Sequence, residues 1–490
     1  METDKIYELT DRNAEWREKL RKVMKPAERT AIKRVIMPEL DAAYRVTNNE
    51  EVSQGLTEEL ALRESTRCLD CPNPGCIEGC PVSINIPAFI KNIQRGHFDD
   101  AARVLKMTSA LPAVCGRVCP QERQCESRCI YLKMKKEPVG IGWLEQFAAD
   151  HGKVGKPYKA QIKNPRRVAV IGSGPAGLSF AGTMAAAGHE VVVYEALHEI
   201  GGVLKYGIPE FRLPNPIVDK EIRMLEEIGV KFYPDVVVGK TLTYDDLKQN
   251  GFEAVFVASG AGLPRFMGIP GENLNGIMSS NEYLTRINLM GAGRGGDTPV
   301  LRGKHVAVIG GGNTAMDSVR TALRMGASKA TIVYRRTEAE MPARRMEIHH
   351  AKEEGVNFMT LHNPEEFVGD EKGRVKKMIL RKMTLGEPDE SGRRSPIPVE
   401  GDEGRVTVEV DEVIVSVGVS PNPLVPASFK ALETTKRDTI VVDDNMQTSV
   451  PMMFAGGDIV RGGATVILAM GDGRKAAESC LRFFAEKDKE

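Results

Sequence analysis

A short pattern that occurs twice limits the possible fold more than any other feature of the sequence. RVAVIGSGPAGLSF starts at Arg167 and HVAVIGGGNTAMDS starts at His305, 138 residues later. In both copies a β-rich run leads into a glycine turn and a helix-like stretch, and a second β-rich run follows. The spacing is too long for a solenoid repeat. We therefore expect two related βαβ modules of the dinucleotide-binding Rossmann type, with parallel sheets, in an α/β fold.

The glycines of the first copy are placed to approach the pyrophosphate of a dinucleotide. Gly172, Gly174 and Gly177 form G-x-G-x-x-G directly after the first strand. In order, these positions permit a tight turn, close approach of the backbone to the pyrophosphate, and close packing of helix on strand. Glu195 ends the second strand, where a carboxylate can accept hydrogen bonds from ribose hydroxyls. The first copy is therefore expected to bind a nucleotide with a free ribose.

The second copy differs at the position that reads the ribose. Its pattern is G-x-G-x-x-A, with Gly310, Gly312 and Ala315. Arg335 replaces the glutamate at the end of the second strand, and Arg336 follows it. An acidic side chain here would repel a 2′-phosphate, whereas an arginine can bind one through charge-assisted hydrogen bonds. The second copy is therefore predicted to bind NADP(H). The alternative is that these arginines form only a solvated strand end.

A third signature, MFAGGDIVRGGATVILAMGDG, lies near the C-terminus. A strand leads into Gly457 and Asp458, and a helix is expected to start near Thr465. Asp458 is suited to bind ribityl hydroxyls, and the helix N-terminus would favour the anion that forms when a flavin is reduced. Together the three signatures resemble the FAD- and NAD(P)H-dependent oxidoreductases of the disulfide-reductase type. YGIPEFRLP, Tyr206–Pro214, is similar to the glutamate synthase small (beta) subunit family. The expected cofactor-binding set also includes Gly202 and Asn313.

The redox-active dithiol that is usual in disulfide reductases is absent from this chain, and the clustered cysteines supply another route for electrons. VLKYGIP, which follows Gly202, contains no cysteine, whereas eight of the nine cysteines lie between Cys68 and Cys129. Their spacings are C-x2-C-x4-C-x3-C-P from Cys68 and C-x3-C-P from Cys115, followed by a further C-x3-C. Short spacings that end in Cys-Pro are typical of iron–sulfur ligands. Structural zinc fits this spacing less well but stays an alternative.

The cysteine-rich segment also resembles the N-terminal cluster domain of dihydropyrimidine dehydrogenase. That resemblance implies two [4Fe–4S] clusters whose ligands interleave along the chain. One cluster would take Cys68, Cys71, Cys76 and Cys129, and the other would take Cys80, Cys119, Cys125 and Glu145. Glu145 stands where dihydropyrimidine dehydrogenase has a glutamine, and Cys115 would then be a structural thiol. Spacing alone leaves open whether Cys115 or Glu145 is the eighth ligand.

Composition weighs against several other classes of protein. The 67 Lys and Arg residues balance 67 Asp and Glu residues, whereas nucleic-acid binders usually carry a basic excess. The charged N-terminus has no apolar core of a secretory signal, and the uncharged stretch 168–188 is too rich in glycine for a membrane span. We therefore expect a cytoplasmic protein that binds neither nucleic acid nor membranes.

These features divide the chain into three expected domains. Residues 1–155 are expected to form an α-helical domain with two [4Fe–4S] clusters. An FAD-binding domain is expected over 165–290 and again over 430–490, because the last signature must return to the nucleotide of the first fingerprint. An NADPH-binding domain, 291–429, would lie between these two parts.

The family resemblance implies a function as well as a fold. It implies an NADPH-oxidising subunit of glutamate synthase that passes electrons through FAD and the clusters to a partner, which makes glutamate from glutamine and 2-oxoglutarate. The glutaminase of that system needs an N-terminal cysteine, and the first cysteine here is Cys68. A separate large subunit or a ferredoxin-type partner is therefore expected, in a hetero-oligomer. The alternatives are the large subunit of an NADH-dependent ferredoxin:NADP oxidoreductase and a non-enzymatic, zinc-bound scaffold.

Overall fold

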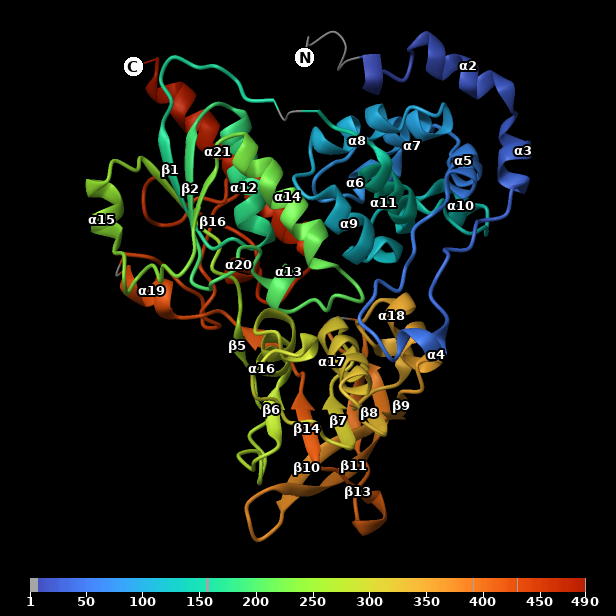
Figure 1. Ribbon diagram of the computed structural model, residues 1–490, viewed down its shortest axis with the longest axis vertical. Helices are drawn as coiled ribbons and strands as arrows, with labels where there is room; N and C mark the ends of the chain where they lie inside the picture. Colours follow the sequence, from blue (N-terminus) through green and yellow to red (C-terminus); the bar gives the residue numbers. More distant parts are fainter. Residues whose placement is uncertain (1–7, 156–157, 391, 430, 490) are drawn as a thin grey trace.

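The computed structural model describes residues 8–155, 158–390, 392–429 and 431–489. A helical N-terminal domain lies beside two α/β domains (Figure 1). The helices of the first domain are α2 (Glu15–Val23), α3 (Pro26–Ala31), α4 (Ala42–Arg45), α5 (Glu58–Arg67), α6 (Gly75–Glu78), α7 (Ile86–Gln94), α8 (Phe98–Lys106), α9 (Pro112–Val118), α10 (Ile130–Lys133) and α11 (Ile141–His151), with 3-10 turns η1 (Gln121–Arg123) and η2 (Glu126–Arg128).

Polar caps and a proline set where several of these helices begin. The Thr57 side chain accepts a hydrogen bond from the Leu60 N–H and caps α5, and Asn85 caps α7 in the same way through the Ala88 N–H. Pro112 starts α9, where its missing N–H would have had no partner within the helix. The helices are short, and most of the cysteines lie at helix ends or in the turns between helices.

The first α/β domain is built on a parallel sheet of strand order β16-β4-β1-β2-β3. Its strands are β1 (Arg167–Ile171), β2 (Glu190–Tyr194), β3 (Lys231–Tyr233), β4 (Ala254–Val257) and β16 (Met453–Ala455). Its helices are α12 (Pro175–Ala186), α13 (Val203–Tyr206), α14 (Asn215–Glu227), α15 (Tyr244–Gln249), α19 (Leu424–Ser428), α20 (Asp458–Arg461) and α21 (Val466–Lys487). β16 pairs with β4, so the C-terminal segment returns to the sheet that carries the first fingerprint. α21 packs along α12 (Figure 1).

The second α/β domain repeats the parallel core and adds an antiparallel sheet. Strands β6 (Ile277–Ser279), β14 (Glu412–Val415), β7 (His305–Ile309), β8 (Lys329–Tyr334) and β9 (Asn357–Thr360) form its parallel sheet in that spatial order. β10 (His362–Gly369), β11 (Val375–Pro388), β12 (Arg394–Pro398) and β13 (Arg405–Glu409) form the antiparallel sheet. The helices include α16 (Ser280–Leu284), α17 (Asn313–Arg324) and α18 (Arg345–Glu353), and this domain lies at the bottom of Figure 1.

A two-stranded antiparallel ribbon joins the two α/β domains. β5 (Leu263–Pro264) pairs with β15 (Val419–Ser420) where the chain leaves the first domain and returns to it. β6 already pairs with β14 of the second sheet, although it lies within the range 165–290 expected for the first domain. We therefore propose that the domain boundaries lie at this ribbon, before residue 277 and near residue 420, because strand pairing defines each core.

The N-terminal domain contacts both α/β domains. Arg123 on η1 donates hydrogen bonds to the carbonyl oxygens of three consecutive residues, 341–343, in the second α/β domain. Arg45 on α4 forms a buried ion pair with Glu354 of the same domain at 2.9 Å. On the other side, α9 packs against α14 and α21 of the first α/β domain. The helical domain is therefore seated against both nucleotide modules.

Candidate functional site

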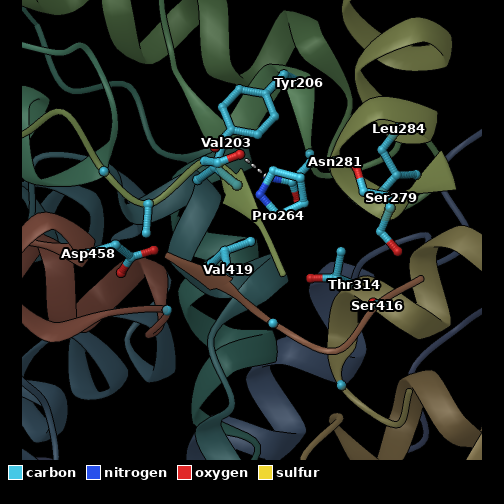
Figure 2. A pocket seen from close by; sticks show the side chains of 18 of the residues that line it. Val203, Tyr206, Pro264, Ser279, Asn281, Leu284, Thr314, Ser416, Val419 and Asp458 are labelled. Carbon is cyan, nitrogen blue, oxygen red and sulfur yellow. Dashed lines mark hydrogen bonds between the residues drawn. The ribbon is translucent and has the colours of Figure 1, made fainter. Parts of the chain in front are cut away.

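A cavity of about 1930 Å³ lies between the two α/β domains, and both glycine fingerprints line it. Figure 2 shows Asp458, Tyr206 and Thr314 around this space, contributed by different parts of the chain. The predicted cofactor-binding residues that line it are Gly172, Gly174, Glu195, Gly202, Gly310, Gly312, Asn313, Arg335, Arg336, Gly457, Asp458 and Thr465. Gly177 and Ala315 are the two predicted residues that do not line it, as expected of positions where helix packs on strand.

The three glycines of the first fingerprint meet different surroundings. Gly172 has a φ of +103°, and a Cβ added there would lie 2.5 Å from the carbonyl oxygen of Ala258. A Cβ at Gly177 would lie 2.0 Å from the carbonyl oxygen of Gly172, so the first turn of α12 fits only without a side chain. At Gly174 nothing lies within 4 Å of an added Cβ. This position opens to the cavity, where backbone can approach a ligand.

Glu195 is held in a fixed orientation at the edge of the cavity. Its Oε2 accepts hydrogen bonds from the Ser173 backbone N–H at 2.9 Å and from the Ser173 hydroxyl at 2.5 Å. Its Oε1 accepts one from the Leu197 N–H at 3.0 Å. The Ser173 hydroxyl also accepts a hydrogen bond from the Gly201 N–H at 2.9 Å, and it thereby joins the fingerprint to the next turn. Sequence reasoning missed Ser173 because it occupies a variable position of the glycine pattern.

Asp458 and the start of α21 form another part of the cavity wall. The Asp458 Oδ1 accepts a hydrogen bond from the Ala464 N–H at 3.1 Å, and burial raises the pKa of this carboxyl to about 6. Thr465 caps α21 by accepting a hydrogen bond from the Leu468 N–H. The long helix therefore presents its positive end at the cavity, which also holds the Asp458 carboxylate that Figure 2 shows.

The second fingerprint has the same construction as the first. Gly310 has a φ of +142°, and an added Cβ would lie 2.3 Å from the carbonyl oxygen of Ser416. Gly312 has nothing within 4 Å of an added Cβ and opens to the cavity. Asn313 is the first residue of α17, and its Oδ1 accepts a hydrogen bond from the Arg344 N–H at 2.8 Å. The N-terminus of α17 thus adjoins the same cavity as that of α21.

The two neighbouring arginines have different surroundings. Arg336 is buried; its Nε donates to the carbonyl oxygen of Arg394 at 2.7 Å, and its guanidinium pairs with Asp389 at 2.5 Å. Arg335 is exposed, lines the cavity, and forms no hydrogen bond or ion pair with another described residue. Arg335 is therefore available for a ligand, whereas Arg336 anchors the β11–β12 hairpin.

Four of the cysteines gather around the end of α5 and the start of α10. Cys68 follows α5, Cys76 lies on α6, and Cys129 precedes α10. Burial and, to a smaller extent, the neighbouring Cys68 and Cys129 thiols raise the pKa of Cys71 to about 11. Burial and the same two neighbours raise the pKa of Cys76. The structure therefore brings together the first set of predicted ligands, although Cys129 is distant from the others in sequence.

The second predicted set surrounds Glu145 on α11. Burial raises the pKa of Cys80 to about 11, and Glu145 is among the charges that raise it. The pKa of Cys119 is raised by a hydrogen bond to Cys115, by burial and by the charge of Glu145. The pKa of Cys125 is likewise raised by burial and by nearby carboxylates that include Glu145. Metal binding would release the protons from these thiols.

Glu145 and Cys115, the two candidates for the eighth ligand, differ in what they touch. Glu145 is buried, its Oε1 has no hydrogen-bond partner, and burial followed by the charge of Glu221 raises its pKa to about 8. The Cys115 Sγ lies 3.5 Å from the Met470 Sδ on α21. A buried carboxylate oxygen without a partner costs free energy, which a metal ligand bond would offset. Both Glu145 and Cys115 therefore border the second cysteine group, and Glu145 is the one that carries a buried oxygen without a partner.

All nine cysteines are free thiols. Within the described ranges, no three His, Cys, Asp or Glu side chains converge on a position that could hold a single ion.

The second cysteine group adjoins the nucleotide cavity. Val118 and Pro120, the two neighbours of Cys119, both line the cavity. An added Cβ at Gly471 of α21 would lie 2.9 Å from the carbonyl oxygen of Pro81, the residue after Cys80. The start of α21 therefore spans from the cavity to this cysteine group.

Two protein families match the chain. Residues 166–473 match the family described as pyridine nucleotide-disulphide oxidoreductase. Residues 45–156 match the family described as dihydropyrimidine dehydrogenase domain II, 4Fe-4S cluster. The second range contains both cysteine groups, and the first contains all three nucleotide signatures.

Similar proteins cover nearly the whole chain. The glutamate synthase [NADPH] small chain of Azospirillum brasilense is 38% identical over 452 residues, which are 89% of this chain and 92% of that protein. The NADP(+)-dependent formate dehydrogenase subunit beta of Moorella thermoacetica is also 38% identical, over 84% of this chain and 60% of that protein. The structure of Mycobacterium tuberculosis FprA in complex with NADPH shares the fold, with a TM-score of 0.56 at 19% identity over 66% of this chain and 86% of that chain.

Among the residues placed by the structure, no helix has the length and apolar character needed to cross a membrane. The α/β class, the two Rossmann-type modules and the preceding iron–sulfur domain are confirmed by the family matches and by the sheets themselves. The chain belongs to the glutamate synthase small chain family within the pyridine nucleotide-disulphide oxidoreductases, and it is an oxidoreductase of the NADPH-dependent flavin and iron–sulfur type.

Proposed function

We propose that this chain is the NADPH-oxidising electron-transfer subunit of a glutamate synthase. Electrons would pass from NADPH to FAD, then through two [4Fe–4S] clusters to a partner subunit that makes glutamate from glutamine and 2-oxoglutarate. The cavity is the observation that carries this proposal, because both fingerprints and both neighbours of Cys119 line it. One space thus adjoins both nucleotide sites and a cysteine of the iron–sulfur domain.

The first module and the C-terminal signature would hold FAD. Gly174 lets the backbone approach the pyrophosphate, Glu195 accepts hydrogen bonds from the ribose, and Asp458 does so from the ribityl chain. Ser173 fixes the Glu195 carboxylate before any ligand arrives, so little reorganisation is needed. Bound flavin supplies the ability to take up a hydride and to release electrons singly. The positive end of α21 would stabilise negative charge at this end of the cavity.

The second module would hold NADPH. Gly312 and the N-terminus of α17 are placed for the pyrophosphate, with Asn313 oriented by its hydrogen bond from the Arg344 N–H. Arg335 would bind the 2′-phosphate, because its guanidinium has no other partner in the described chain. Arg336 would support it indirectly by holding the β11–β12 hairpin in place.

The two cysteine groups would each hold one cluster. We assign the first cluster to Cys68, Cys71, Cys76 and Cys129, and the second to Cys80, Cys119, Cys125 and Glu145. The second group adjoins the cavity, whereas Cys71, Cys76 and Cys129 of the first group are partly exposed. Electrons would therefore enter at the second cluster and leave at the first.

The partner is the part of the proposal that depends most on the relatives. Glutamate synthase small chains are named as one chain of a larger enzyme, and this chain matches 92% of the length of the Azospirillum protein. We propose a hetero-oligomer with a large subunit that carries the amide-transfer chemistry. A ferredoxin-type electron acceptor is the second candidate, since a similar chain also occurs in an enzyme other than glutamate synthase, as subunit beta of an NADP(+)-dependent formate dehydrogenase.

Reconstitution of the whole reaction tests this proposal. The purified chain should contain flavin and about eight irons per chain, and NADPH should bleach the flavin and the cluster absorbance without oxygen. Mixed with a glutamate synthase large subunit, it should support glutamate formation from glutamine and 2-oxoglutarate with NADPH as the reductant. Reduction of the clusters without any glutamate formation would leave an electron-transfer protein but refute the glutamate synthase assignment.

A further inference from the structure

We propose that α10 and its flanking residues form the docking surface for an electron-accepting protein with an acidic face. The inference rests on the proposed function, because it concerns where electrons leave the first cluster. We call this region the α10 surface, and it consists of Arg128, Ile130, Leu132, Lys133, Met134 and Lys135. It begins next to Cys129, a proposed ligand of that cluster.

Large apolar side chains are exposed on the α10 surface. Ile130, Leu132 and Met134 are 36%, 44% and 39% exposed. The residue between the first two, Tyr131, is fully buried, and its hydroxyl donates to the carbonyl oxygen of Arg67 at 2.7 Å. The buried tyrosine anchors α10 and fixes the direction of its neighbours. Three large apolar groups held outward within five residues favour contact with a partner.

The charges on the α10 surface have one sign. Residues 128–136 include four basic side chains and no carboxylate, in a chain whose formal net charge is zero. Arg128, Lys133 and Lys135 form no ion pair with any residue that the structure describes, and Lys136 donates to the carbonyl oxygen of Thr30 at 2.6 Å. Unpaired cations around an apolar centre attract an acidic face and repel a basic one.

The α10 surface lies next to the more exposed of the two cysteine groups. Cys71, Cys76 and Cys129 are partly exposed, whereas Cys80, Cys119 and Cys125 of the other group are buried. Arg128 also lies beside the helix that carries Cys76, since an added Cβ at Gly75, the residue before Cys76, would lie 3.7 Å from the Arg128 Cβ. A partner on the α10 surface would therefore lie over the more accessible group. Electron-transfer encounters use small interfaces, so the few residues of the α10 surface suffice for such a contact.

A second basic surface provides a matched control. Arg265, Lys436, Arg437 and Arg461 line a separate cavity of about 600 Å³, which shares Val419 and Gly463 with the nucleotide cavity. Arg461 is bound by both oxygens of Asp472 at 2.6 Å, and Arg265 donates to the Ser420 hydroxyl at 2.8 Å. A partner docked here would take electrons at the flavin end of the molecule and not from the first cluster.

Charge reversal at the two surfaces distinguishes them. The test compares the double variant Lys133→Glu/Lys135→Glu with Lys436→Glu/Arg437→Glu in the full-length holoprotein. The probe acceptor is an acidic plant-type [2Fe–2S] ferredoxin, with its reduction by NADPH followed through cytochrome c. Bleaching of the flavin and clusters by NADPH alone, together with iron content, reports on each variant without any acceptor protein.

We expect the α10 variant to lower kcat/KM for ferredoxin about 10- to 100-fold at low ionic strength, because opposite charges steer association. The difference should shrink strongly at high salt, and bleaching by NADPH should be unchanged. The docking role of the α10 surface would be refuted if kcat/KM for ferredoxin fell only in the Lys436/Arg437 variant or fell equally in both variants. It would also be refuted if the wild-type protein did not reduce ferredoxin. Failure of NADPH to reduce the clusters in the wild-type protein would instead refute the proposed electron path.

Discussion

Replacement of Arg335 by glutamine should separate binding of NADPH from binding of NADH. Arg335 lines the cavity at the end of β8 and has no other partner among the described residues, so its loss should leave the protein fold unchanged. The substitution removes the cation that is placed to bind a 2′-phosphate but keeps a polar, shorter side chain. NADH has no such phosphate and should be unaffected.

The size of the effect follows from the exposure of the side chain. A hydrogen bond to a charged group contributes about 1.5–3 kcal/mol. Arg335 is exposed to solvent, which screens the interaction, so the lower end, about 1.5 kcal/mol, applies. At 1.4 kcal/mol per factor of ten, the KM for NADPH should rise about tenfold.

Steady-state reduction of a small dye by NADPH and by NADH measures this difference directly. Arg345→Gln is the matched control, because Arg345 is an exposed arginine nearby that does not line the cavity. The control should leave both KM values unchanged. Equal increases for NADPH and NADH in Arg335→Gln, or no change for either, would refute the assignment of Arg335 to the 2′-phosphate.

Three further changes have expected outcomes that follow from the contacts described above. Glu145→Ala should lose or perturb one cluster while FAD and NADPH binding persist, and Cys115→Ala should keep both clusters. Iron content and low-temperature EPR measure this, and they would show the reverse if Cys115 were the ligand. Gly177→Ala should abolish FAD binding and lower the melting temperature, because its Cβ would lie 2.0 Å from a carbonyl oxygen, whereas Gly174→Ala should fold and only weaken FAD binding. Glu354→Gln should cost about 3 kcal/mol of stability, because Arg324 loses its only carboxylate partner among the described residues, and the buried Arg320 and Arg45 each lose one of theirs. Burial raises the pKa of Glu354, but hydrogen bonds from two arginines lower it to about 2. The stability that this carboxylate contributes is therefore present above pH ~4.3 and is lost as the pH falls towards 2. Thermal melts over that pH range would show no such loss if the ion pairs contributed nothing.

The sequence was sufficient to predict features whose signal is local. The glycines of each fingerprint, the acidic residue at one strand end and the arginine at the other all lie within a single βαβ unit. Their register depends only on strand length and turn geometry, and the cavity brings them together as that register predicts. The end of the first nucleotide domain was less predictable, because β6 was identified only by its pairing with β14.

Features that depend on distant partners could not be predicted in the same way. Arg335 and Arg336 look equivalent in sequence, but Arg336 is committed to Asp389, 53 residues away on a hairpin with no sequence signature. The orphaned oxygen of Glu145 likewise depends on how α11 is buried among other helices. The grouping of Cys129 with the early cysteines came only from a family resemblance, since spacing along the chain does not report on three-dimensional proximity.

The contacts between domains explain why one cavity can serve two nucleotides and a cluster group. Arg212, from the segment YGIPEFRLP of the first α/β domain, forms a buried ion pair with Asp317 on α17 of the second at 2.6 Å. Arg45 of the helical domain pairs with Glu354, which also binds Arg320 of α17 at 2.7 Å. If the domains moved apart, the buried Arg212 and Arg45 would lose carboxylate partners, which is costly, whereas Glu354 would keep Arg320. The three domains are therefore held in one arrangement, and the α/β domains without the helical domain would lack both a wall of the cavity and a partner for Glu354.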